Sequence, residues 1–500
     1  MPAKLVLCVI DAMAPAMLER VVASGAAPVL ETLIERGRYV PDCVAAFPSV
    51  TPVCAASIVT GVGQEAHRIP AMNWFHREED RYVEYGSSFR AAQRFGIARQ
   101  LTDTVYNMNR AHLSPETPTV FEALDDANVR TAGTTYLMYR GRHRHEPQRD
   151  TTLTRVASRL MRHPVMGPRE LFYADIFASR RTGCRSGLGM PGVRDRHSGC
   201  VSAYMVEHDL FDFLLLSLPD NDWYSHKNGP EAQVQSLAQA DLQLARVMNA
   251  AGGVDRFLED HAVIAMADHS QVAITDTIAL QDELAELGVL EPARPARSSG
   301  GAGDGEPRIA VCPSQRAAMV YALHESERDS MRALVEARAL AIEGVDLVMW
   351  LERDAHDAPR EGVISSPLHG ELRFSPGGAV EDPRGTAWSV AGALAALDGT
   401  IENGVLLTPA YPDALARVWS ALRCPTAGEV LLSAARGYEF IDWGRQAHVG
   451  GGSHGSLHAS DSLGALILSG VSLPDPEPVQ WAIRDVAQIV LGHFGLAAHG

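Results

Sequence analysis

Aspartate and histidine side chains follow three apolar runs of the sequence, each close to the point where the run ends. Asp11 closes the run KLVLCVID, and Asp222 and His226 lie four apart shortly after the run FDFLLLSL. Asp268 and His269 directly follow the run HAVIAMA. One such residue alone would predict a turn or a helix cap. Three groups in one chain instead indicate metal ligands, and Asp and His without Cys suit Zn²⁺ or Mn²⁺.

Two further segments carry residues that belong to the same chemistry. The Gly-rich stretch GGSHGSLH contains His454 and His458, and AAFPSVTPVCAASIVTG places Thr51 where a loop enters a helix. The candidate oxygen and nitrogen donors are sufficient in number for two metals that share a substrate oxygen. Two-metal sites with ions ~3.5–4 Å apart serve phosphoryl chemistry, because they hold both the attacking and the leaving oxygen.

The elements that must position these residues alternate along the chain. The sequence predicts strands at 4–11, 211–220 and 261–268, and helices at 27–37 and 229–253. This order favours an α/β fold with a mostly parallel central sheet and helices on both faces. Open sheets of this kind bind ligands at the carboxyl ends of their strands, so we expect the Asp and His groups to meet at one edge.

Two regions interrupt the alternation and predict a domain organisation. Residues 137–200 are Arg-rich and poorly periodic, which indicates a cap inserted near the mouth of the site. A flexible loop at 296–307 leads into an α+β insertion at 308–426. The catalytic core is therefore predicted to comprise 1–295 and 427–500.

Composition limits the classes of partner. The chain has 500 residues, 46% of them apolar, and a net charge of −17, which argues against binding a nucleic-acid polymer. Its longest apolar runs are far shorter than a membrane span, and we interpret the N-terminal run as a core strand rather than a signal peptide. Seven irregularly spaced Cys without a C-x-x-C pair predict incidental thiols and a cytoplasmic location. The oligomeric state stays open.

The motifs as an ordered set resemble a known family. FPSVT followed by TG, D-x-x-x-H-x-x-G-P, ADHS and GGSHGS, after a strand that ends in Asp, look like the alkaline phosphatase superfamily. The branch they resemble is the type I phosphodiesterase/nucleotide pyrophosphatase family. The resemblance extends over most of the chain, through YPDALARVWSALRC and RGYEFIDWG. It implies an alkaline-phosphatase-like fold.

The resemblance also implies two divalent metal ions, Zn²⁺ with Mn²⁺ as the alternative, and a role for each motif residue. One metal would be held by three side chains: Asp222, His226 and His454. The other would be held by four: Asp11, Thr51, Asp268 and His269. Thr51 would be the nucleophile rather than Ser49, because it lies nine residues before the TG at 60–61.

Some positions depart from the family pattern or leave a choice. Asn73, in IPAMNWF, resembles the Asn that helps to bind a phosphoryl oxygen, although its spacing from the Thr is one residue longer than usual. His454 fits the pattern better than His458, because it directly precedes a Gly. Asp220 could replace Asp222, but only Asp222 has the four-residue spacing to the following His.

The resemblance implies a dimetal hydrolase that cleaves phosphodiester or phosphoanhydride bonds through a phosphothreonine intermediate. Its substrates would be small phosphate esters, anhydrides or nucleotides. Trp74, Phe75 and Tyr82 could stack on a nucleobase, and the Arg cluster at 139–155 could add positive charge. The alternatives are a phosphonate hydrolase, a phosphomonoesterase or phosphomutase with the same site, and a catalytically silent binding protein.

Overall fold

The computed structural model describes residues 3–151, 154–155, 157–158, 161–292, 306–354 and 356–497. Its first sheet contains eight strands: β1 (Lys4–Ile10), β2 (Arg38–Val44), β5 (Thr131–Thr134), β8 (Glu170–Tyr173), β9 (Phe177–Ala178), β10 (Phe213–Leu218), β11 (His261–Met266) and β25 (Leu463–Ser469). Their order is β2-β25-β11-β1-β10-β5-β8-β9. The middle strands β11, β1, β10, β5 and β8 run parallel, and antiparallel strands close both edges. The predicted α/β fold with a mostly parallel sheet is confirmed.

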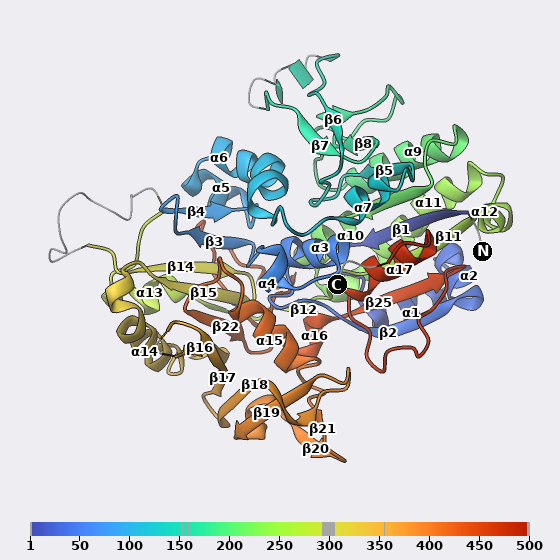
Figure 1. Ribbon diagram of the computed structural model, residues 1–500. Helices are drawn as coiled ribbons and strands as arrows, with labels where there is room; N and C mark the ends of the chain where they lie inside the picture. The colour runs from blue at the N-terminus through green and yellow to red at the C-terminus, as the bar shows by residue number, and fades with distance from the viewer. Residues whose placement is uncertain are drawn as a thin grey trace.

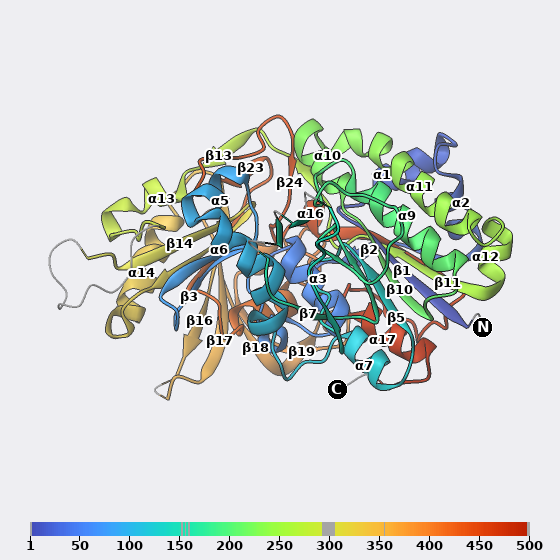
Figure 2. The same cartoon turned by 90° about the horizontal axis from the view of Figure 1, so that it is seen from above.

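Helices cover both faces of this sheet because its strands are apolar on both sides. On β1, Leu5, Leu7 and Val9 pack into one core cluster, and the alternate residues Val6 and Cys8 pack into another. The first cluster includes residues of three helices: α3 (Thr51–Thr60), α7 (Val120–Asp126) and α17 (Asp485–His493). The second includes residues of four: α1 (Pro15–Ala23), α2 (Pro28–Arg36), α9 (Arg194–Glu207) and α11 (Gln233–Asn249). Figure 2 shows these two layers on opposite sides of the strands.

A second sheet lies beside the first (Figure 1). It contains nine strands: β14 (Ile309–Ser314), β15 (Ala317–Ala322), β16 (Val345–Arg353), β17 (Pro359–Ser366), β18 (Gly370–Glu381), β19 (Ala387–Gly392), β20 (Thr400–Glu402), β21 (Val405–Leu407) and β22 (Val430–Ala434). β22 pairs with β15 and β16, although the predicted core segment 427–500 includes it. The chain rejoins the first sheet only at β25. A short buried strand such as VLLSA fits either sheet, and its sequence does not say which. The division into domains otherwise stays a prediction, and the loop predicted at 296–307 lies outside the described residues except for its last two.

The predicted cap at 137–200 contributes to several structures. It forms a two-stranded ribbon of β6 (His143–His145) and β7 (Val165–Gly167). It then supplies β8 and β9 to the edge of the first sheet, and the first half of α9. A disulfide joins Cys184 to Cys200 and ties the preceding loop to α9. The prediction of incidental thiols is therefore wrong for these two residues, whereas the other five Cys are free and buried. Within the described residues, no helix is both long and apolar enough to cross a bilayer.

A buried ion pair joins the second sheet to α16 (Ala459–Ser462), the helix that leads into β25 of the first sheet. Arg316 lies in the turn between β14 and β15, and its Nη1 is 2.7 Å from Asp461 Oδ1, with both side chains fully buried. The other guanidinium nitrogens donate to backbone carbonyls, and the backbone N–H of Arg316 donates to His454 O at 2.9 Å. Asp461 also accepts from Ser456 N and Oγ. The pair therefore holds the Gly-rich loop that carries His454 between the two sheets.

We predict that Arg316→Met lowers the free energy of unfolding by ~3–5 kcal/mol, because it leaves the buried Asp461 carboxylate without its counter-charge. Urea unfolding followed by circular dichroism measures the loss. Adding Asp461→Asn to this variant should recover part of the stability, because the amide keeps an acceptor but carries no charge. The matched control is Arg445→Met, which breaks an exposed pair with Asp282 and should change little. A loss for Arg316→Met no larger than the control's would contradict the prediction.

Candidate active site

Asp11 and Asp268 lie side by side at the carboxyl ends of two neighbouring parallel strands. In the register of β1 and β11, Val9 faces Met266, so the residues two positions further along each strand also come together. His269 Nε2 lies 3.6 Å from Asp11 Oδ1 and 3.5 Å from Asp268 Oδ2. One ligand atom of each of these three residues lies within 4.8 Å of the other two, so they could hold one metal ion.

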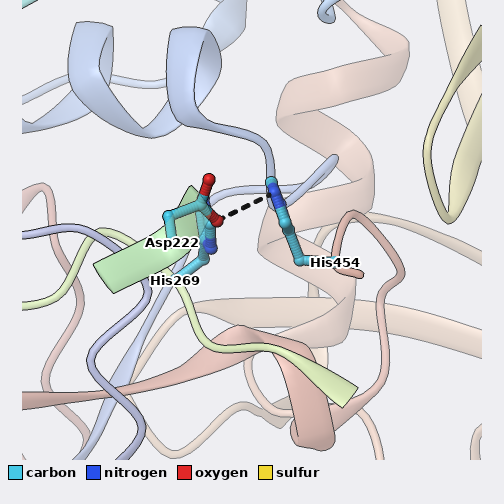
Figure 3. Close-up of side chains that lie close together, drawn as sticks. All are labelled: Asp222, His269 and His454. Atoms are coloured by element: carbon cyan, nitrogen blue, oxygen red, sulfur yellow. Dashed lines mark ion pairs between the residues drawn. The ribbon is translucent and has the colours of Figure 1, made fainter. Parts of the chain in front are cut away.

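Asp222, His269 and His454 form a second group of the same dimensions, drawn in Figure 3. Asp222 lies on α10 (Asp220–Asn228), directly after β10, and its Oδ1 is 3.6 Å from His454 Nε2 and 3.4 Å from His226 Nε2. The resemblance placed His226 rather than His269 with Asp222 and His454. The structure brings both His residues to Asp222, and His269 stands between the two groups, stacked on His454 at 3.7 Å between ring centroids.

Three of the imidazoles are held in the tautomer that a metal requires. His226 Nδ1 donates to Gly452 O and His454 Nδ1 donates to Ser49 O, each at 2.7 Å. His269 Nδ1 donates to the carbonyl of the next residue at 3.2 Å. Since a carbonyl oxygen only accepts, each Nδ1 carries the hydrogen, and in the neutral ring Nε2 keeps its lone pair. Such backbone bonds orient the His ligands of metal sites.

The electrostatics of the carboxylates also fit a cation. Burial raises the pKa of Asp11 well above its usual value, and the charges of Asp268 and Asp222 raise it further, against Arg194, which lowers it. Asp11 Oδ1 and Asp268 Oδ2 are buried, and neither accepts a hydrogen bond from the described residues. Burial would also raise the pKa of Asp222, but the three neighbouring imidazoles lower it overall. Two carboxylates that each keep one buried oxygen without a donor, next to imidazole nitrogens, form a ligand set that a divalent metal takes.

Thr51 brings a hydroxyl to the first group. It is the first residue of α3, and its Oγ1 lies 3.2 Å from His269 Nε2. Pro52 follows it at a position that suits the start of a helix, because its missing N–H would have no partner there. The positive end of the helix dipole favours negative charge on a group placed at this end. Ser49 is the weaker candidate, because its hydroxyl donates to Ser456 O and accepts from Gly455 N.

Asn73 makes its hydrogen bonds away from this group. Asn73 lies buried on β3 (Asn73–His76), where its side-chain amide donates to Val83 O and its backbone N–H donates to Ser314 Oγ. Its role at a phosphoryl oxygen stays a prediction. His458 also lies apart from the metal-ligand groups, since it caps α16 (Ala459–Ser462) by accepting from Ser460 N.

A cavity of about 310 Å³ opens beside Thr51, Asp11, Asp222 and Asp268. The aromatic residues predicted to stack on a base do not line it. Trp74, Phe75 and Tyr82 are all less than 5% exposed and belong to the core cluster, so that interpretation is wrong. Closely spaced aromatic residues in a sequence are consistent with an exposed surface for stacking, but these three side chains pack into the core.

The Arg cluster at 139–155 does not reach the cavity either. Arg140 and Arg142 bind Glu122, and Arg144 binds Glu146. Arg194 lines the cavity instead, and it binds Asp220, the spare carboxylate, at 2.9 Å. Asp220 therefore binds Arg194 and belongs to neither metal-ligand group.

Sequence reasoning missed three polar residues near the groups. Arg194 is one of several Arg in a segment without periodicity, so no signal marked it. Gln271 donates to Asp222 Oδ1, and Gln315 Nε2 lies 3.4 Å from His226 Nε2. The position of Gln271, two residues after His269, was the one sequence signal that could have placed it near the site. Gln315 had no such signal, because it reaches the site from the second sheet.

Comparisons with known proteins agree with this arrangement. The sequence matches the family model for type I phosphodiesterase / nucleotide pyrophosphatase over residues 5–456. A search of the curated proteins gives no match.

Among solved structures, the chain is similar to murine and human ectonucleotide pyrophosphatase / phosphodiesterase 5, with TM-scores of 0.56 and 0.57 and identities of 11% and 12%. In both cases the match covers 99% of this chain and 96% of the other. It is also similar to phosphonoacetate hydrolase from Sinorhizobium meliloti 1021 in complex with phosphonoformate, with a TM-score of 0.54, 17% identity, and coverage of 98% and 96%. At such identities the structures support the fold alone. The family model spans nearly the whole chain, and so the ordered motifs, the fold and the match together establish that this chain belongs to the type I phosphodiesterase/nucleotide pyrophosphatase family, a family of enzymes.

Proposed function

We propose that this enzyme is a two-metal hydrolase that cleaves phosphodiester or phosphoanhydride bonds through a phosphothreonine intermediate. The observation that carries the proposal is the position of Thr51. Its hydroxyl lies 3.2 Å from His269 Nε2, at the start of a helix and beside two carboxylates that each have a buried oxygen without a hydrogen-bond donor from the described residues. A nucleophile, a set of metal ligands and a cavity for a small molecule thus occur together.

Asp11, Asp268 and His269 would hold one metal, with Thr51 beside it, and Asp222, His226 and His454 would hold the other. When bound, two divalent cations lower the pKa of a coordinated hydroxyl and offset the charge of the phosphoryl oxygens. We propose Zn²⁺, with Mn²⁺ as the alternative, because both accept carboxylate and imidazole ligands.

The chain's own residues then account for the bonds that form and break. Thr51 Oγ1 forms a bond to phosphorus and loses its proton to solvent, while the leaving group departs from the opposite face with the bonding electron pair. The start of α3 stabilises negative charge at Thr51 during this step. Water cleaves the resulting phosphothreonine and returns a proton to the Thr51 oxygen. The sum is hydrolysis of one phosphoryl bond.

The substrate is proposed to be a small phosphate ester, anhydride or nucleotide, which suits a cavity of about 310 Å³. A structural neighbour, the inactive murine protein, was solved with AMP, and the bacterial neighbour was solved with phosphonoformate and phosphonoacetate. Phosphonate hydrolysis is therefore the second candidate. A cytoplasmic location stays a proposal, and the Cys184–Cys200 disulfide weighs against it, because disulfides are rare in a reducing cytosol.

We predict that Thr51→Ala lowers phosphodiesterase turnover ~10³-fold or more, because the variant lacks the nucleophile but keeps the remaining site. Steady-state assays with thymidine 5′-monophosphate p-nitrophenyl ester measure turnover, and elemental analysis measures bound metal. Thr60→Ala is the matched control, since Thr60 lies at the other end of α3 and its hydroxyl donates to Ala56 O, in the same helix. Thr51→Ala should retain most of its metal. Turnover equal to that of the control would exclude Thr51 as nucleophile.

Removal of the metals should abolish turnover, and added Zn²⁺ or Mn²⁺ should restore it. We expect about two metals per chain in the loaded protein. We also expect a higher melting temperature with metal, because the cation offsets the repulsion between buried carboxylates. Asp268→Asn should bind less metal, whereas Asp220→Asn should bind as much as the unchanged protein. If the protein binds no metal when excess Zn²⁺ is supplied, and shows no turnover, the result would instead indicate a catalytically silent binding protein.

A further inference from the structure

Arg194 is the one basic side chain among the described residues that line the cavity beside Thr51. It is the first residue of α9, and its side chain is 22% exposed. Its Nε donates to Asp220 Oδ1 at 2.9 Å and its Nη2 donates to Pro219 O at 3.1 Å. Both partners belong to the segment that leads from β10 to Asp222. The guanidinium is therefore fixed in place by the strand end that supplies a metal-ligand candidate.

These bonds leave part of the guanidinium unused. Nη1 donates to no residue that the structure describes, so one edge of the group is open. The charge of Asp220 is shared as well, because its carboxylate also accepts from the backbone N–H groups of Gly192 and Asp195. A planar cation with a fixed orientation and a free edge is suited to binding a carboxylate or phosphate.

Arg194 is the only positive charge in the described lining of the cavity; apart from the carboxylates, the other polar side chains there carry hydroxyls, such as those of Tyr85 and Tyr136. Much of its wall is apolar: Met72, Leu101, Val105, Leu137, Met161, Ile176 and Leu188. Its three carboxylates belong to the candidate metal-ligand groups. At about 310 Å³ the cavity is at the lower end of the range of small-molecule sites, ~300–1,000 Å³. A ligand that fits is compact, and Arg194 is the positive charge that the lining offers to an anionic group outside the reacting phosphoryl group.

The hydrogen bonds of Arg194 are the basis for inferring which part of the substrate it meets. Thr51 belongs with Asp11 and Asp268, whereas the guanidinium of Arg194 is bonded to the segment that leads to Asp222, the carboxylate of the other group. The charge of Arg194 also acts on Asp11, whose pKa it lowers. In an in-line displacement, the leaving group departs opposite the nucleophile. This inference rests on the proposed function, because it takes Thr51 as that nucleophile.

We infer that Arg194 binds an anionic leaving group, a carboxylate or a phosphate, and so selects compact phosphoryl substrates whose departing part is charged. A substrate of this class carries two anionic groups: the phosphoryl group that Thr51 attacks and the group that Arg194 holds. Arg194 is thus a specificity residue of the reaction, and esters with an uncharged leaving group gain nothing from it.

Two matched substrate pairs test this role in the metal-loaded enzyme. The first is phosphonoacetate and its carboxyl ethyl ester, and the second is thymidine triphosphate and thymidine 5′-monophosphate p-nitrophenyl ester. Within each pair the phosphoryl group is the same, and the leaving part is charged in one bound substrate and uncharged in the other. Arg194→Gln should lower kcat/KM for the charged member about 10- to 100-fold, the effect of one lost charged hydrogen bond, mainly through KM. It should lower kcat/KM for the uncharged member by less than about 3-fold.

The control and the conservative variant separate this role from a structural one. Arg196→Gln, on the same helix but exposed and outside the cavity wall, should leave both members unchanged. Arg194→Lys should recover part of the loss, because it keeps the charge without the planar fork. The pair that wild-type enzyme turns over identifies carboxylate or phosphate as the group held. An equal fall for both members of that pair would overturn the inference.

A binding measurement keeps the inference testable if the enzyme hydrolyses neither pair, a result that would overturn the proposed function. Calorimetry with phosphonoformate and methylphosphonate compares a phosphonate that has a carboxylate with one that does not. Arg194→Gln should weaken the binding of phosphonoformate about 10-fold or more and leave that of methylphosphonate unchanged. Equal binding of phosphonoformate by both proteins would overturn the role of Arg194 independently of any turnover.

Discussion

The repulsion between two buried carboxylates is the constraint on which the rest of the structure depends. Asp11 and Asp268 occupy equivalent positions just beyond β1 and β11, and the parallel register of those strands fixes their approach. Each has a buried oxygen without a hydrogen-bond donor. Holding two such groups together is unfavourable unless a cation lies between them. A well-packed sheet, apolar on both faces, provides the stability that keeps them in place.

The surrounding elements complete the site around this pair. β10 and α10 bring Asp222 and His226 from one side, and the loop before α16 brings His454 from the other. The second sheet does not supply a metal-ligand candidate in either group. Its contribution is indirect, because Arg316 binds Asp461 and the carbonyl of His454. The position of one His ligand candidate thus depends on an ion pair between the second sheet and α16.

The sequence predicted those parts of the site that follow continuous apolar strands. Asp11 and Asp268 could be found because KLVLCVI and HAVIAM read as buried strands, and parallel strands present their ends at one edge. Asp222 was distinguished from Asp220 by its spacing to His226, and the structure agrees by binding Asp220 to Arg194.

Features that depend on packing between distant segments could not be read in this way. The inward packing of Trp74, the pairing of β22 with the second sheet and the disulfide between Cys184 and Cys200 all depend on neighbours far away in sequence. Arg194 carried no local signal, since the Arg residues around it have no period. His269 was assigned to a single metal, yet its ring lies between both groups, which only the three-dimensional arrangement shows.

The order of the strands also has a consequence for the synthesis of the protein. All nine strands of the second sheet are translated after Asp268 and before His454. β25, which lies against β11, is translated later still. A chain that is still attached to the ribosome can align β1, β10 and β11, since domains begin to fold during translation. The first group of metal-ligand candidates is therefore complete in the growing chain before the second, whose His454 is translated only after the whole second sheet.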